Sequence, residues 1–324
     1  MDHQKCAGVC TADESRMPEF EVRKVDRSYA QSVETVGSKP KFWFRDGKRR
    51  YLFKADDRGT GEDWAEKIVC ELCELLGLPH VEYELASEVE GERYIRPGVV
   101  CENMTPSPAE LVLGNDLMLA VDPEYPVQQR FKVRQHSVQN VRETVLNLEP
   151  PDPIWMSRVP VDVKSAMDVF VGYIMLDAWV ANQDRHHENW GAIRDTNTTR
   201  LAPTFDHGAA LARNLLDSER QERLSTSDGN RTVSAFVRKG RSAFYGSHDQ
   251  KRSLELAEAF LAFARCAPVA AAAWLDRLRA VGSESVQMIV DRIPGVRMSE
   301  ICKLFTLELL RTNQKRLLDL KVTE

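Results

Sequence analysis

The feature that most constrains the fold of this sequence is an apolar stretch, AMDVFVGYIMLDAWVANQ, at residues 166–183. A helix that is apolar on most of its faces has to be covered by other elements. No run in the chain approaches 18 consecutive apolar residues, so no membrane span is predicted. We therefore predict that residues 166–183 form a buried helix inside a larger helical region.

Composition places the chain among globular proteins of about two domains or one large bilobal domain. Hydrophobic residues make up 43% of the 324 residues and charged residues 29%, enough for a packed core and a solvated surface. The formal net charge of −5 gives no electrostatic reason to expect direct nucleic-acid binding. Residues 1–18 have no signal-peptide pattern and are expected to be a flexible leader, which favours a cytoplasmic location.

The seven cysteines are scattered and do not suggest a disulfide framework. Cys70 and Cys73 have the spacing of a redox motif or of half a zinc site. They lie, however, in a stretch whose apolar residues recur at helical period, and no second Cys or His pair stands at a matching distance. We predict that both thiols fill space in a core.

Residues 19–103 are predicted to form a small sheet lobe with one covering helix. The β-rich runs KFWF at 41–44 and RYLFKA at 50–55 flank an Asp-Gly pair, which is typical of a β-hairpin.

A helix is expected over residues 62–76, ended by Gly77. Two further strands are expected in VEYELASE at 81–88 and RYIRPGVVCEN at 93–103, the latter interrupted by Pro97-Gly98.

Residues 104–324 are predicted to form a larger helical lobe, so the expected fold class is α+β and bilobal. After the buried helix comes a polar loop region at 184–208. The stretch 213–252 is rich in Ser, Thr and basic residues, and is either a surface loop or a segment that binds substrate. The last third of the chain is helical by period.

The polar loop region contains the residue types that phosphoryl transfer requires. Such a reaction needs a carboxylate beside the attacking hydroxyl and oxygen ligands for Mg²⁺. Asp184 and Asn189, five residues apart on one loop, supply the candidate base and one metal ligand. Asp206, predicted to end a short strand and followed by Gly208, supplies the other metal ligand.

A lysine for the nucleotide phosphates and an acidic partner for it are found in the sheet lobe. Lys54 lies in a predicted strand, and the helix that follows carries Glu66. Glu62, one turn earlier, competes for the role of partner, but the spacing from Glu66 to Gly77 favours Glu66.

The set of motifs resembles a known family. Asp-Arg-His-x-x-Asn from Asp184 to Asn189, followed by Asp-x-Gly from Asp206, is similar to the HipA-like serine/threonine kinases and, more distantly, to the phosphatidylinositol 3-/4-kinases. The resemblance extends over about residues 35–210. It implies a bilobal protein-kinase-like fold that binds ATP and Mg²⁺ and transfers phosphate to Ser or Thr of a protein substrate. By the same resemblance, Asp184 is the catalytic base.

Further roles follow from the resemblance. Lys54 would contact the α- and β-phosphates and Glu66 would orient it, while Asn189 and Asp206 would ligate Mg²⁺. The segment Gly37-Ser38-Lys39 is the candidate phosphate loop, and phosphorylation of Ser38 there would silence the enzyme.

The hinge between the lobes is expected near residues 101–105, with Glu102 on the cofactor. An antitoxin-like partner chain and a role as a toxin or regulatory enzyme are left open.

Three other functions remain open from the sequence. A lipid or small-molecule kinase would use the same scaffold, and a non-catalytic binding module would have kept the fold alone. A metal-dependent phosphohydrolase would use a local set of histidines and carboxylates, namely His186, His187 and His207 with Asp184, Glu188 and Asp206. In the kinase interpretation His186 packs the catalytic loop and His187 is exposed.

Overall fold

The computed structural model describes residues 17–33, 40–105 and 107–322. The predicted leader, apart from its last two residues, and the segment Gly37-Ser38-Lys39 therefore lie outside the described residues. Within the described ranges, no helix is both long and apolar enough to cross a membrane.

The N-terminal part is a six-stranded sheet in the order β1-β5-β6-β4-β3-β2, with one helix against it. Only the β1–β5 pairing is parallel. The elements are β1 (Val22–Asp26), a 3-10 turn η1 (Arg27–Tyr29), β2 (Ser32–Val33), β3 (Lys41–Asp46), β4 (Arg49–Ala55), α1 (Glu62–Leu76), β5 (Glu84–Glu90) and β6 (Arg93–Glu102).

The rest of the chain is mostly helical, with a three-stranded sheet in the order β7-β8-β9 at its edge. Its elements are β7 (Glu110–Leu113), α2 (Gly114–Val121), α3 (Val138–Leu146), α4 (Pro153–Met156), α5 (Ala166–Val180), β8 (Gly191–Arg194), β9 (Thr199–Leu201), α6 (Asp217–Ser225), α7 (Val233–Arg238), α8 (Leu256–Ala264), α9 (Pro268–Ala280), α10 (Ser283–Asp291) and α11 (Glu300–Leu318). The predicted α+β class is confirmed.

Helix α5 is the predicted buried helix, and nearly all of its residues are inaccessible to solvent. It packs against α8, α9 and α11, as an all-round apolar helix must. Its first turn carries a capping box between Ser165 and Asp168, and its C-cap, Ala181, is left-handed. The polar loop with Asp184 therefore begins from a rigid, buried support.

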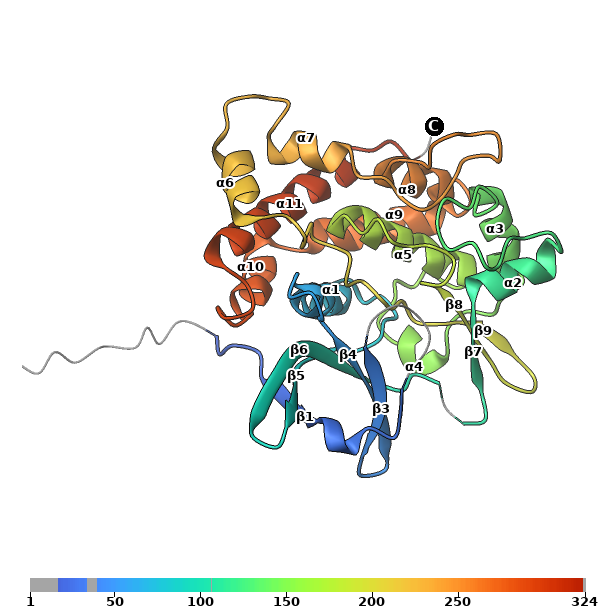
Figure 1. Cartoon of the computed structure of the whole chain (residues 1–324). Coiled ribbons are helices and arrows are strands. Elements are labelled where there is room, and N and C mark those ends of the chain that lie inside the picture. The colour runs from blue at the N-terminus through green and yellow to red at the C-terminus, as the bar shows by residue number, and fades with distance from the viewer. Residues whose placement is uncertain (1–16, 34–39, 106, 323–324) are drawn as a thin grey trace, which may run out of the picture.

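Helix α1 lies between the six-stranded sheet and the helical part (Figure 1). It spans the predicted residues and ends at Gly77, whose φ of +71° suits glycine. Cys70 and Cys73 are buried on it as free thiols, which confirms that they fill the core. Burial raises the pKa of Cys70 to about 12, so this thiol is inert at neutral pH.

Two details of the predicted strands were wrong. Strand β6 runs without a break through Pro97-Gly98, because the missing N–H of Pro97 faces the end of β4 and its carbonyl still accepts from Asp56. Glycine is required at the next position, since a Cβ on Gly98 would lie 2.3 Å from the carbonyl oxygen of Lys54. The predicted loop region 184–208 contains β8 and β9.

Candidate active site

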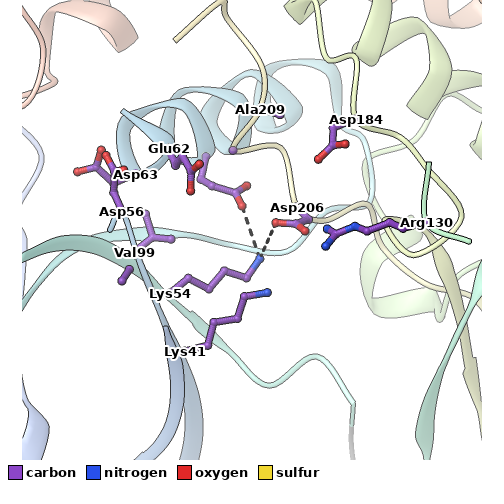
Figure 2. A pocket seen from close by; sticks show the side chains of 13 residues that line it. Lys41, Lys54, Asp56, Glu62, Asp63, Val99, Arg130, Asp184, Asp206 and Ala209 are labelled. Carbon is purple, nitrogen blue, oxygen red and sulfur yellow. Dashed lines mark hydrogen bonds and ion pairs between the residues drawn. The ribbon is translucent and has the colours of Figure 1, made fainter. Parts of the chain in front are cut away.

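One pocket gathers four of the site residues selected from the sequence, Lys54, Glu66, Asp184 and Asp206, and we call it the Lys54 pocket. It lies between the six-stranded sheet, α1 and the loops that follow α5 and β9 (Figure 2). Its lining is Lys41, Lys54, Ala55, Asp56, Glu62, Asp63, Glu66, Val99, Arg130, Asp184, Asp206, Gly208 and Ala209.

Lys54 on β4 stands at the centre of this pocket. Its Nζ atom lies 3.5 Å from Oε1 of Glu66 and 3.3 Å from Oδ1 of Asp206. Burial disfavours the charge of Lys54, but the nearby carboxylates, Asp206 foremost, outweigh it and raise the pKa of Lys54 well above its usual value. The amine is therefore a permanent cation in a place that solvent barely reaches.

Helix α1 presents its acidic residues to different partners. Glu66, not Glu62, contacts Lys54, and it also accepts a 2.8 Å hydrogen bond from the backbone N–H of His207. Glu62 instead forms an ion pair with Arg213. One carboxylate thus joins the lysine to the Asp206 segment; the sequence spacing favours Glu66 over Glu62 as the partner of Lys54 but does not predict the contact with His207.

Tyr83 is a part of the site that the sequence reasoning missed. Its buried hydroxyl accepts hydrogen bonds from Nζ of Lys54, at 2.9 Å, and from the backbone N–H of Asp206, at 3.4 Å. Burial raises the pKa of Tyr83 well above its usual value, so the hydroxyl stays neutral. In the sequence it is one aromatic residue in an alternating stretch, with no local signal of this role.

Asp206 does not end a strand, contrary to the prediction. Strand β9 stops at Leu201, and Asp206 has a φ of +61°, a conformation that few residues other than glycine adopt. The N–H of Asp206 is used by Tyr83 and that of His207 by Glu66, so neither is available to a strand partner. Such strain is typical of functional segments held by their surroundings.

The loop after α5 orders Asp184 and Asn189 around a buried arginine. Arg185 donates two 2.8 Å hydrogen bonds to the carboxylate of Asp177, and its guanidinium also donates to the carbonyls of Asn189 and Phe205. This side chain therefore ties the Asp184 loop to the segment that leads into Asp206. The arginine of the Asp-Arg-His-x-x-Asn motif therefore has a structural role.

Asn189 and Asp184 face one another across that loop. The Nδ2 atom of Asn189 donates to the carbonyl of Asp184 at 2.7 Å, which leaves Oδ1 as the amide atom that can ligate a cation. The carboxylate of Asp184 is 38% exposed and lines the Lys54 pocket. Asp184 is thus accessible to a reacting hydroxyl, while its backbone is fixed.

The histidines do not form the metal site that a phosphohydrolase would need. No three His, Cys, Asp or Glu side chains of the described residues are grouped so that they could share a metal ion. His186 is buried as predicted, but His187 is also buried and not exposed, because it packs on Tyr125 and its Nδ1 atom lies 2.7 Å from that hydroxyl. Burial lowers the pKa of His186 to about 3 and that of His187 to about 4.

Two cations that the sequence reasoning did not select also enter the pocket. Lys41 on β3 pairs in register with Lys54 and extends alongside it (Figure 2). Arg130, from the segment between α2 and α3, points toward Asp206 from the other side (Figure 2). Neither residue belongs to a recognisable sequence motif, and only the tertiary fold brings both of them to the pocket.

Glu102 lies apart from the Lys54 pocket. It is the last residue of β6, its side chain forms an ion pair of 3.0 Å with Arg49, and it borders a separate hollow with Asn103, Met104 and Leu201, the Glu102 hollow. The side chain of Glu102 therefore does not take part in the group of residues around Lys54.

The donor set of the pocket suits a hard divalent cation. Asp206 lines the pocket and offers carboxylate oxygens, whereas Asn189 is buried, is not a lining residue and offers an amide oxygen from beside Asp184; both are ligand types that Mg²⁺ prefers. Carboxylates outnumber lysine and arginine side chains in the lining, so phosphate groups there would need additional positive charge. The residues present thus fit a magnesium site.

Comparisons with known proteins bear on the fold. No protein-family model matches the sequence, and no curated protein matches it. The proinflammatory kinase CtkA of Helicobacter pylori superimposes with a TM-score of 0.66 over 91% of this chain and 96% of that chain, at 20% identity. HipA of Shewanella oneidensis MR-1, solved with HipB and operator DNA, gives a TM-score of 0.53 over 90% and 68%, at 12% identity. This chain has a HipA-like kinase fold.

The HipA-like kinase fold confirms the bilobal kinase-like architecture predicted from the sequence. In this fold the sheet that carries Lys54 faces the loops that carry Asp184 and Asp206. The contact between Lys54 and Asp206 joins the sheet to these loops.

Proposed function

We propose that this chain is a kinase that uses ATP and Mg²⁺ to phosphorylate a Ser or Thr hydroxyl of a protein. The observation that carries the proposal is the contact of Lys54 with both Glu66 and Asp206, in a pocket that Asp184 also lines. The kinase fold supports it.

The phosphate end of the nucleotide is assigned to the Lys54 pocket. Lys54 would bind phosphate oxygens as a fixed cation, and Glu66 and Tyr83 would hold its amine in place. Lys41 would add a second positive charge from the neighbouring strand. The segment Gly37-Ser38-Lys39 remains the candidate phosphate loop.

The base of the nucleotide is assigned to the edge of β6. Strand β5 begins at Glu84, opposite Val100, so β6 extends two residues past that pairing. Successive residues of an antiparallel strand direct their N–H and C=O groups to alternate neighbours. Those of Glu102 therefore point away from β4, to the side of β6 on which β5 has not yet begun. The backbone of Glu102, rather than its side chain, would therefore contact an adenine ring in the Glu102 hollow.

Asp184 would act on the acceptor. The hydroxyl oxygen attacks the γ-phosphorus, the bond between that phosphorus and the β–γ bridging oxygen breaks, ADP leaves, and the hydroxyl proton passes to the carboxylate of Asp184. Asn189 and Asp206 would hold Mg²⁺, which supplies neutralisation of phosphate charge. The protein contributes mainly fixed positions, because the Arg185 contacts hold both loops before substrate arrives.

The test identifies the acceptor. Purified protein is incubated with γ-labelled ATP and Mg²⁺, alone, with a mixture of cytosolic proteins, and with phosphoinositide vesicles, beside the Asp184→Ala variant. We expect label on Ser or Thr residues, located by mass spectrometry and absent in the variant. Label only on lipid would replace the proposal with a lipid kinase, and neither label nor ATP binding would refute it.

A further inference from the structure

A hollow of about 340 Å³ opens on the other side of Asp184, and we call it the Phe131 hollow. Asp184 and Arg130 line both this hollow and the Lys54 pocket. The residues that line the hollow include Arg130, Phe131, Lys132, Asp184, Ser242 and Tyr245. The two spaces therefore meet at the candidate base.

The Phe131 hollow, which shares Asp184 with the Lys54 pocket, is suited by its position to the approach of an acceptor. In-line transfer requires the attacking hydroxyl to face the γ-phosphorus from the side opposite the leaving oxygen. If the phosphates lie beside Lys54, the hydroxyl reaches Asp184 from the Phe131 hollow.

The segment that forms one wall is exposed and conformationally strained. Phe131 is 58% exposed, although it also contacts His186 edge-on. Lys132 beside it has a φ of +58°, which is unfavourable for a residue with a Cβ. No ion pair joins Lys132 to any carboxylate in the described part of the chain. Arg130 lies over the Phe131 ring, 5.3 Å from its centroid, so the strained and exposed residue is Lys132, and such a residue at the edge of a site points to a contact made with a ligand.

The opposite wall comes from the basic stretch that the sequence analysis left open. Ser242 and Tyr245 line the hollow, and the backbone N–H of Arg241 donates to the side chain of Gln183, next to Asp184. The same loop carries two further basic residues, Lys251 and Arg252, and one acidic residue, Asp249.

Of the other charged groups at the hollow, Asp184 contributes a negative charge, and the remainder are partly compensated or neutral. Glu188 pairs with Arg130 at 3.3 Å and Glu255 approaches Arg241 at 4.0 Å. His136, which also lines the hollow, stays uncharged because burial lowers its pKa to about 3. Lys132 is consequently the lining cation that forms no ion pair with a carboxylate of the described residues.

We propose that the Phe131 hollow binds a segment of a partner polypeptide in which an acidic residue neighbours the acceptor Ser or Thr. Lys132 pairs with that acidic side chain and Phe131 covers an apolar part of the segment. The proposal rests on the proposed kinase function for the role of Asp184. Its binding part does not need catalysis.

The test measures peptide binding by fluorescence anisotropy and phosphorylation in parallel. Two labelled peptides of equal length carry a central Ser flanked by Glu or by Lys. The full chain is compared with Lys132→Glu and with Lys132→Gly, which removes the side chain at a φ that suits glycine and so should keep the protein folded. Lys164→Glu is the matched control, because Lys164 is exposed and lines neither space.

The unmodified chain should bind the Glu peptide at least about fivefold more tightly than the Lys peptide, and the preference should weaken with salt. Both Lys132 variants should lose that preference, and Lys164→Glu should keep it. Equal binding of the two peptides, a preference that survives in Lys132→Gly, or displacement of the Glu peptide by a nucleic-acid oligomer at lower concentration would overturn the proposal.

Failure of this proposal is distinguishable from failure of the kinase assignment. Transfer of phosphate to other acceptors without the charge preference would refute only the acidic-peptide site. Selective binding of the Glu peptide with no phosphate transfer to any acceptor would support the site and refute the kinase.

Discussion

The Nζ atom of Lys54 lies 3.3 Å from Oδ1 of Asp206, although 152 residues separate them in the chain. This contact closes the pocket between the sheet and the loop after β9. It depends on a tyrosine hydroxyl that accepts from both residues. The proposed activity should therefore respond to changes that leave every charged side chain of the site in place.

Tyr83→Phe is the sharpest such change. It removes the shared acceptor and leaves the partly buried N–H of Asp206 without its partner, which should cost about 1 kcal/mol of unfolding free energy. We expect kcat to fall severalfold because Lys54 is less firmly placed. Urea denaturation and steady-state kinetics measure both. Tyr29→Phe is the control, since Tyr29 is 65% exposed, and an equal loss there would contradict the account.

Arg213 should affect activity through α1. Its guanidinium contacts the carbonyl of Gly208, the hydroxyl of Thr60 and the carboxylate of Glu62, so it ties the segment after Asp206 to the start of that helix. Arg213→Ala should lower kcat about tenfold or more, since small displacements of catalytic groups are costly. Steady-state kinetics on the purified variant would show this.

Two other arginines calibrate that result. Arg279 forms an exposed ion pair with Asp276, so Arg279→Ala should change neither activity nor stability measurably. Arg297 pairs with buried Asp63, and Arg297→Ala should destabilise the fold by about 3 kcal/mol or more. Normal kcat in Arg213→Ala would show that this contact does not position the site.

Acid should destabilise the fold through buried histidines. Burial lowers the pKa of His136 and His186 to about 3 and of His187 to about 4, from the usual 6.5. The unfolded chain then binds more protons than the folded one between these values. The stability from these neutral rings is complete above pH 6.5 and declines as the pH falls toward 3–4, by up to about 1.4 kcal/mol per unit for each ring.

A variant isolates one of these rings. In His136→Asn the difference in unfolding free energy from the unmodified chain should shrink as the pH is lowered from about 7.5 to about 4.5. Chemical denaturation at several pH values measures it. A difference that stays constant over this range would show that His136 is not held neutral by burial.

The sequence predicted those parts of the structure that depend on local signals. The helix over 62–76 ends at a glycine, and the hairpin around Asp46-Gly47 has a turn sequence, so both have the predicted positions. The order of motifs identified the fold, and the helical spacing selected Glu66 over Glu62 as the partner of Lys54.

What the sequence did not predict depends on tertiary contacts. Tyr83, Lys41 and Arg130 reach the pocket from three separate segments and carry no local pattern. The kinase interpretation expected His187 to be exposed, yet packing on Tyr125 buries it. The phosphate loop and the antitoxin-like partner stay predictions of the sequence resemblance.

The most direct test of the central claim is the rate of phosphate transfer from ATP in four variants: Lys54→Met, Asp184→Ala, Asn189→Ala and Asp206→Ala. Each variant is first shown to be folded by an unchanged far-UV circular dichroism spectrum and by unchanged thermal unfolding followed with a dye. The account predicts that every variant loses at least about 100-fold in rate while staying folded. A rate equal to that of the unmodified chain in Asp184→Ala or Asp206→Ala would contradict it.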